Sequence, residues 1–352
     1  MIDTIRLKLP LTPLILRQIH ESSKTEITTP GKGQKFFAPL IVPPYDNELT
    51  IIKGYDLLSI KRPSMFFYVE GSIPNLEYGE NVSLVYPEQL PDVFMRMETA
   101  LINQYGDVPP WREWEVQRVD PVYAWKFPNK GDAQKVLDFF QSLLYSRKKK
   151  RTYGDETVLF IGPSFSIQFY LKEPEFKKHG YKKLVQLGDK ESADKTLELS
   201  KEVVRFEIRM FKGKLQTSIG KKIITCNDIL DPSWYIKVLN EALTMLLKTP
   251  NRNSSSDREA LIKLKETYKE EKAMRLFYFW KTYYLDENIK KVIKENSNPT
   301  TVSRNMKDIA EAGVGISDSS NLPQGFDLSI PSKSVVNLIA SDPIAPAMGH
   351  DD

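Results

Sequence analysis

Alternation of apolar and polar residues marks three strands in the middle of the chain. Residues 203–211 (V-V-R-F-E-I-R-M-F) and 166–172 (S-I-Q-F-Y-L-K) alternate cleanly, and residues 116–127 do so less regularly. Successive side chains of a strand point to opposite faces of a sheet, so each segment has one apolar and one polar face. We expect the three strands to be neighbours in one antiparallel sheet, with helices on its apolar face.

Apolar residues at helical spacing predict helices in much of the remaining chain. One helix is expected to begin at Asp92 and to end before Gly106, and the next to be capped by Asp132. Residues 1–75 are rich in Pro, Gly and β-branched residues, which predict strands and loops. The pattern is helical from Pro232 onward. The predicted fold class is therefore α+β, an antiparallel sheet with helices on one face, followed by a helical part.

The length and these patterns predict two domains and a tail. A chain of 352 residues is long enough for two domains that each bury a core. We assign residues 1–230 to the sheet-containing domain and residues 231–318 to a helical C-terminal domain. The segment 319–352 has few apolar residues suited to a core, and we expect it to be poorly ordered.

The composition of the chain indicates where in the cell the protein is expected. No apolar stretch approaches the ~20 residues of a membrane span, and the first ten residues lack the long apolar region of a signal peptide. Cys226 is the single cysteine, so no disulfide can form within the chain, which suits a reducing compartment. We therefore predict a cytoplasmic protein with no membrane partner.

Positive charge is concentrated in the middle of the chain. Residues 140–225 hold 19 Lys and Arg against 10 Asp and Glu, although the net charge of the whole chain is only +4. The densest part is the run S-R-K-K-K-R between Tyr145 and Tyr153, which we predict to be a loop. Such a run is compatible with an ordinary solvated loop. Its functional interpretation is a nucleic-acid contact, because Lys and Arg bind phosphates.

The polar faces of the three strands carry candidate chemistry. If the strands are neighbours, Asp120, Glu207, Tyr170 and Lys172 gather on one face with several arginines. Carboxylates suit a hard cation such as Mg²⁺ or Mn²⁺, and a tyrosine hydroxyl can act as a nucleophile. These are the parts of a metal-assisted phosphodiester transferase. The same residues also permit a simpler interpretation, in which Tyr170 only packs and the carboxylates pair with Arg118 and Arg205.

Other catalytic motifs are missing from the sequence. His20, His179 and His350 are far apart, so there is no pair of histidines separated by one hydrophobic residue. The chain also has no P-loop, no G-x-G-x-x-G and no C-x-x-C motif, which argues against an ATPase or a zinc module.

Five short motifs follow one another along most of the chain. They are M-I-D-T-I-R-L-K-L-P at the start, Q-R-V-D at 117–120, Y-G-D-E-T-V at 153–158, F-Y-L-K-E-P-E-F at 169–176 and V-R-F-E-I-R at 204–209. Each motif alone is weak, but their order and spacing resemble those of the gene II/X family of phage and plasmid replication initiators, typified by the filamentous-phage replication protein.

The resemblance implies a rolling-circle initiator. Such proteins nick one DNA strand through a tyrosine, keep the 5′ phosphate attached, leave a 3′ hydroxyl for a polymerase and later rejoin the displaced strand. Carried over to this chain, Tyr170 would be the nucleophile, Lys172 and Glu175 would complete its block, and Asp120 and Glu207 would hold Mg²⁺ or Mn²⁺. The implied fold is a degenerate relative of the His-hydrophobic-His nuclease domain, in which acidic residues bind the metal.

The chain departs from the family pattern at two positions. Leu171 stands where related initiators often have Asp, but it is expected to face the core. Lys214 stands where a tyrosine can occur, so the source of any second tyrosine for termination is in doubt.

The implied partners are a single-stranded or hairpin DNA origin and host replication proteins such as a helicase and a polymerase. The basic residues that we expect to bind DNA are Arg118, Arg147, Lys148, Lys149, Lys150, Arg151, Arg205, Arg209 and Arg304.

Two alternatives remain open on the sequence. Thr300 or Thr301 can cap a helix carrying Arg304, Asn305 and Lys307, which resembles the recognition helix of a helix-turn-helix module. A plain amphipathic packing helix fits this segment equally well. For the whole chain, the alternative to an enzyme is a non-catalytic DNA-binding regulator on the same fold. A tyrosine recombinase fits less well, because Tyr170 lacks the Arg and His residues that such an enzyme places around its tyrosine.

Overall fold

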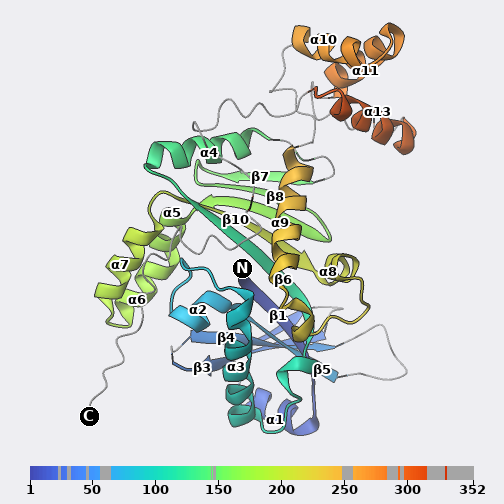
Figure 1. Cartoon of the computed structure of the whole chain (residues 1–352). Helices are drawn as coiled ribbons and strands as arrows, with labels where there is room; N and C mark the ends of the chain where they lie inside the picture. The colour runs from blue at the N-terminus through green and yellow to red at the C-terminus, as the bar shows by residue number, and fades with distance from the viewer. Residues whose placement is uncertain are drawn as a thin grey trace.

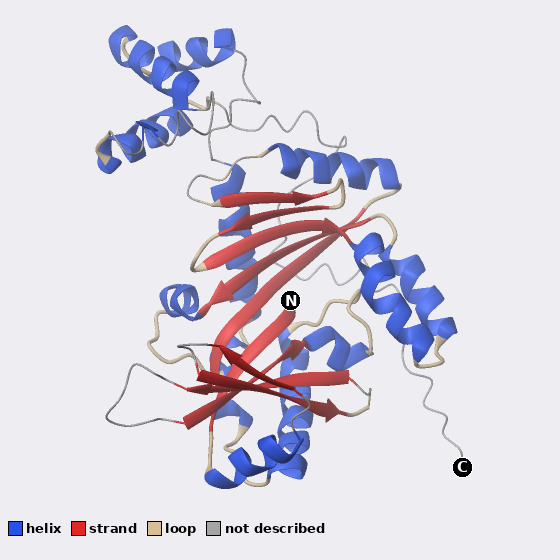
Figure 2. Ribbon diagram, turned by 180° about the vertical axis from the view of Figure 1, so that it is seen from behind, coloured by secondary structure: helices blue, strands red, loops and turns tan. Residues whose placement is uncertain are grey.

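The computed structural model describes residues 1–22, 25–29, 33–44, 47–55, 65–143, 145, 148–247, 257–283, 292–293, 297–314 and 330. These residues form an α+β fold around one antiparallel sheet (Figures 1 and 2). The sheet has ten strands in the order β2-β3-β4-β5-β1-β6-β10-β9-β8-β7. Within the described residues, no helix combines the length and the apolar composition needed to span a bilayer.

The strands are β1 (Ile2–Pro10), β2 (Thr25–Thr29), β3 (Gly33–Val42), β4 (Asn47–Tyr55), β5 (Met65–Ser72), β6 (Glu115–Lys126), β7 (Lys149–Tyr153), β8 (Thr157–Ile161), β9 (Phe165–Leu171) and β10 (Val203–Phe211). The helices before β10 are α1 (Pro13–Ser22), α2 (Ile73–Tyr78), α3 (Leu90–Tyr105), α4 (Lys130–Ser142), α5 (Lys172–Phe176), α6 (Lys182–Gln186) and α7 (Lys190–Ser200). After β10 come α8 (Lys212–Ile219), α9 (Pro232–Leu247), α10 (Asp257–Thr267), α11 (Glu270–Tyr283) and α13 (Pro299–Glu311).

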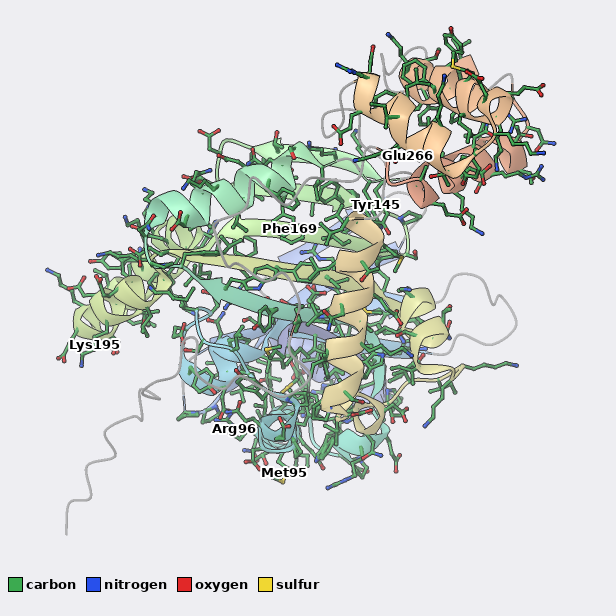
Figure 3. The ribbon with its side chains drawn as sticks, turned by 45° about the horizontal axis from the view of Figure 1, so that its top comes forward. Met95, Arg96, Tyr145, Phe169, Lys195 and Glu266 are labelled. Carbon is green, nitrogen blue, oxygen red and sulfur yellow. The ribbon has the colours of Figure 1, made fainter. Side chains whose placement is uncertain are left out.

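The three strands predicted to be neighbours lie side by side. β10 pairs with β6 on one side and with β9 on the other, both antiparallel. Their apolar faces form an aromatic core. The ring centroid of Phe169 lies 3.6 Å from that of Phe140 on α4 and 4.8 Å from that of Phe206 on β10 (Figure 3 labels Phe169). Leu171 is buried in the same core, as predicted.

Helices α4 and α9 cover this apolar face. The helix α9 lies in front of the sheet in Figure 1 and behind it in Figure 2, where the strands are seen from the other side. Buried residues of both helices belong to the main core cluster, including Leu137 of α4 and Leu239 of α9. The helices α10, α11 and α13 contribute to a separate cluster that includes Leu264, Trp280 and Ile309. The division into domains stays a prediction, and this packing favours a boundary after Leu247 rather than at residue 230.

Several local predictions were wrong. The basic run is not simply a loop, because its residues from Lys149 onward form the edge strand β7. The cap of α4 is Asn129, whose side chain accepts from the backbone N–H of Asp132. The cap of α13 is Asn298 rather than a threonine. In each helix, the capping Asn stands immediately before the first helical residue, where a short side chain reaches an unpaired N–H.

Helix bounds near the N-terminus also differ from the prediction. The segment predicted as strands and loops contains α1, and α3 begins at Leu90 rather than at Asp92. The end of α3 before Gly106 is confirmed; this glycine has a φ of 81°. Apart from Ile330, the predicted tail 319–352 lies outside the described residues. Ile330 is buried in the main core, and its backbone exchanges two hydrogen bonds with the side chain of Asn240.

Candidate active site on the polar face of the sheet

Cross-strand register brings the predicted site residues onto one face. Arg205 of β10 lies opposite Tyr170 of β9, and two residues further along Glu207 lies opposite Gln168. Directly opposed residues of an antiparallel pair share a face, so Tyr170, Arg205 and Glu207 point the same way. On β6, Val122 lies opposite Glu207, and Asp120 follows by alternation on the same face.

Asp3 joins this face through an irregularity in β1. Pairing between β1 and β6 shifts register between Ile2 and Ile5, both of which are fully buried. The shift is a bulge, and bulges redirect side chains. The carboxylate of Asp3 lies 3.4 Å from Arg205 Nη1. Asp3 is not among the site residues predicted from the sequence. The apolar residues Ile2 and Ile5 are three positions apart instead of two, and this break in the alternation of β1 indicates the bulge.

Tyr170 is buried among charged groups. Only 5% of its surface is exposed, and its hydroxyl lies 3.5 Å from Glu207 Oε2. Burial raises the pKa of Tyr170 well above its usual value, although the positive charge of Arg205 opposes that shift. The hydroxyl is therefore held in its neutral form, and the nearby cation is the group that favours its ionisation.

Lys172 lies beside the tyrosine but not on its strand. The strand β9 ends at Leu171, and Lys172 opens α5, which corrects the prediction of a shared strand face. Its Nζ is 5.7 Å from the centre of the Tyr170 ring and forms a salt bridge with Glu175. Burial, and then the charge of Arg205, lower the pKa of Lys172 to about 8. The pKa of Glu175 is lowered: burial acts to raise it, but the charge of Lys172 outweighs that effect together with smaller contributions.

The two predicted metal carboxylates have different surroundings. Both oxygens of Asp120 accept from Arg118, whose Nε is 2.8 Å from Oδ1, so the expected alternative of an ion pair is present here. Glu207 has no such pair with Arg205, which instead lies against Asp3. Burial, and then the charges of Asp3 and Asp120, raise the pKa of Glu207 to about 8.

These carboxylates fit a hard cation by charge and by ligand type. A divalent ion beside Glu207 would relieve the repulsion that raises its pKa. The positions of Asp120 and Glu207 do not by themselves form a metal site. Within the part of the chain that the structure describes, no group of three or more His, Cys, Asp and Glu side chains is arranged to hold a metal ion. Arg118 also holds both oxygens of Asp120, so a cation would have to displace one of these hydrogen bonds.

A loop between α2 and η1 (Pro87–Gln89) lies against this polar face. Arg205 donates to the backbone carbonyls of Asn81, at 2.6 Å, and of Val82. The side chain of Asn81 donates to Glu175 at 3.3 Å, and Val82 is fully buried against Phe176 in a small apolar cluster. The loop thus forms hydrogen bonds with Arg205 and Glu175, two of the charged residues near Tyr170. The sequence carries no signal for these contacts, which join residues more than 90 positions apart.

The predicted DNA-binding residues divide by accessibility. Arg205 is fully buried, and Arg118 is largely buried against Glu70 and Asp120. Arg209 keeps 44% of its side chain exposed. Arg147 lies outside the described residues. On α13, Arg304 is exposed, but its neighbour Asn305 is buried. These two side chains therefore cannot both contact DNA bases from one exposed face of a recognition helix.

The basic run is split by the alternation of β7. Lys149 and Arg151 are exposed. Lys148 is half-buried, with its Nζ 2.6 Å from the carbonyl of Phe165, and Lys150 donates to the carbonyl of Gln141 at the end of α4. Lys148 and Lys150 therefore have structural partners, whereas Lys149 and Arg151 can meet solvent or a ligand.

Comparison with known proteins identifies the family. No curated protein sequence matches the chain at a significant level. The family model for the N-terminal part of the gene II replication-associated protein of phages matches residues 1–225. That match covers well over half of the chain, including β1, β6, β9, β10 and all the side chains gathered around Tyr170. The chain therefore belongs to this family of gene II-like phage replication initiators.

Proposed function

We propose that this protein is a rolling-circle initiator that nicks and joins a DNA strand through Tyr170. The observation that carries the proposal is the setting of the tyrosine. Its hydroxyl lies 3.5 Å from Glu207 Oε2 and is influenced by the charge of Arg205, and Lys172 Nζ lies 5.7 Å from the centre of its ring. All these residues belong to the part of the chain that matches the replication family. Strongly perturbed ionisable groups clustered in this way are typical of catalytic sites.

In the nicking step, the Tyr170 oxygen attacks a phosphodiester phosphorus. A bond forms between that oxygen and the phosphorus, the bond to the 3′ oxygen breaks, and the leaving 3′ oxygen takes a proton from water to become the 3′ hydroxyl of the other DNA segment. A neutral amine on Lys172, whose pKa is about 8, can accept the phenolic proton. Arg205 favours the phenolate and the phosphate by its charge. Joining is the reverse reaction with a different 3′ hydroxyl, and host polymerase would extend the first one.

A divalent metal would complete the chemistry. Asp120 and Glu207, with Asp3 beside them, are the residues that would hold it. When bound, Mg²⁺ or Mn²⁺ polarises a non-bridging phosphate oxygen and stabilises charge on the leaving oxygen. The fold that we infer for residues 1–230 is correspondingly a degenerate nuclease-like domain.

DNA must gain access to Tyr170 before any chemistry. Because the tyrosine is buried and the loop at Asn81 and Val82 is bonded to Arg205, we infer that this loop moves when DNA binds. A melted or hairpin origin is the expected substrate, since a duplex hides its strands. The helices from α10 to α13, with Arg304 exposed, are the proposed contributors to origin recognition.

One observation favours the alternative of a non-catalytic DNA-binding regulator. Tyr170 is buried with a raised pKa, and Asp120 is fully engaged by Arg118, as expected of residues that only stabilise the fold. A regulator would keep the exposed basic residues and would form no covalent product.

The deciding experiment uses Tyr170→Phe with a labelled single-stranded or supercoiled origin and Mg²⁺ or Mn²⁺. The substitution keeps the ring and removes the only attacking atom, at a cost of ~1 kcal/mol in stability if the hydroxyl merely hydrogen-bonds. We expect wild-type protein to carry label after denaturation, and the variant to bind DNA without nicking or attachment. Mass spectrometry should place the phosphate on Tyr170. An adduct on Tyr153 would move the nucleophile, and an active origin without any adduct would favour the regulator.

A further inference from the structure

The polar face continues from Tyr170 to the edge of the sheet. Tyr170 lies opposite Thr157 of β8, and Thr157 lies opposite Tyr153 of β7. In the next row, Glu207, Gln168, Leu159 and Arg151 follow one another across the four strands. Because directly opposed residues share a face, Arg151 and Tyr153 point to the same side as the candidate active site.

This part of the face becomes more exposed towards β7. Tyr170 is 5% exposed and Tyr153 is 55% exposed. Two strand spacings separate them, about 10 Å in the direction of the hydrogen bonds. Thr157 of β8 lies directly between them, and further along β8 Leu159 and Ile161 are half-buried apolar side chains on the same face. The surface therefore runs from the buried candidate site, across β8 with its two apolar side chains, to an exposed edge with an aromatic ring.

The cations of this edge point to the same side. Lys149 lies opposite Ile161 and Arg151 opposite Leu159, and both are exposed. Arg209 of β10, on the same face, is partly exposed but already pairs with Asp120 at 3.6 Å. Lys148 and Lys150 are held against Phe165 and the end of α4, as described above. The exposed positive charge of Lys149 and Arg151 is thus directed to the active-site face.

We propose that the face of β7 and β8 formed by Lys149, Arg151, Tyr153, Leu159 and Ile161 is a track for single-stranded nucleic acid leading to Tyr170. This inference rests on the proposed nicking function and adds the path of the strand. Lys149 and Arg151 bind phosphates, and the Tyr153 ring stacks on a base close to the scissile phosphate. Leu159 and Ile161 lie under the unpaired bases.

The chemistry of the track favours a single strand over a duplex. A duplex presents phosphates and hides its base faces, so it would use the cations and leave an exposed aromatic ring and an apolar strip without a function. A single strand offers phosphates and base faces together, and proteins that bind it combine cations with stacking aromatic rings. An acidic protein would match the charge but not the stacking.

The test measures binding of full-length protein to a fluorescent single-stranded oligothymidine and to a duplex of equal length, over a range of salt concentrations. For single strands, each phosphate contact contributes ~0.7 to the slope of log affinity against log salt. We expect Lys149→Ser/Arg151→Ser to weaken binding at least tenfold at low salt and to lower that slope by about 1.4. Lys190→Ser/Lys195→Ser on α7 removes the same charge from another exposed site and should change binding little (Figure 3 labels Lys195).

The tyrosine distinguishes the possible ligands. Tyr153→Ala should weaken single-strand binding roughly 5- to 150-fold, the range for loss of one base stack, with an unchanged salt slope. Tyr153→Phe keeps the ring and should bind normally. If Tyr153→Ala binds like wild type, or if the control pair on α7 loses as much affinity as the β7 pair, the track is refuted. Equal losses for duplex and single strand in the β7 pair, with Tyr153→Ala silent, would refute it in favour of a duplex contact.

Failure of the track and failure of the proposed nicking function give different results. The Tyr170→Phe protein, assayed alongside, should keep single-strand affinity and lose the covalent product. Normal track behaviour in a protein that never forms an adduct would leave the track intact and refute the nicking function. An adduct in a protein whose Tyr153→Ala variant binds normally would do the reverse.

Discussion

Asp120→Asn separates a metal carboxylate from a structural ion pair, because the two roles predict different sets of losses. Asp120 is fully buried, and both of its oxygens accept from Arg118. Asn keeps one acceptor oxygen but directs an NH₂ group at the guanidinium. A hydrogen bond to a charged group is worth ~1.5–3 kcal/mol, and an entirely unpaired buried charge costs ~3–5 kcal/mol. Arg118 retains Glu70 at 2.7 Å, so we expect a loss of about 2 kcal/mol.

The expected loss is large enough to measure by urea unfolding, as a lower midpoint with an unchanged slope. If Asp120 also holds the metal, nicking in Mg²⁺ or Mn²⁺ should disappear while DNA binding remains. Glu70→Gln is the control, because it weakens the other salt bridge of Arg118, together with that of Arg6, and leaves Asp120, Glu207 and Asp3 in place. It should lower stability by a similar amount and still nick. Wild-type nicking by Asp120→Asn would remove Asp120 from the metal site, and an unchanged unfolding midpoint would refute the stability argument.

Two further predictions concern pH and access. The single-turnover nicking rate should rise with pH between about 7 and 9, because the pKa of Lys172 is about 8 and its amine can accept the phenolic proton only when neutral. A flat or falling profile would contradict this role of Lys172. Asn81→Ala removes the hydrogen bond to Glu175 and should speed adduct formation by loosening the loop. Slower adduct formation at unchanged DNA affinity would mean that the loop assists chemistry rather than blocking access.

The strands of the site were predictable because alternation is a local property. The polar faces of β9 and β10 follow from their own residues, and so does the grouping of Tyr170 with Glu207 once the strands are neighbours. Local patterns contain no information on contacts between distant segments. The bonds from Arg205 to Asn81 and Val82 join residues 124 and 123 positions apart, and no periodicity in either segment predicts them. The edge strand β7 was missed for a related reason, since a run of charged residues looks like a loop until a neighbouring strand pairs with it.

The buried charged residues help to distinguish an enzyme from a regulator. Among the described residues, the charged side chains that are buried are Glu80, Asp120, Lys172, Arg205 and Glu207. Lys172, Arg205 and Glu207 lie around Tyr170, Asp120 is close enough to Glu207 to raise its pKa, and Glu80 lies in the loop bonded to Arg205. Burying ions is costly, and well-packed apolar residues of similar size are often as stabilising or more so. A regulator needs phosphate contacts, which the exposed cations of β7 already provide, and gains nothing from a buried charged cluster. A nucleophile that must ionise in a dry site requires such a cluster, so the distribution of buried charge favours catalysis.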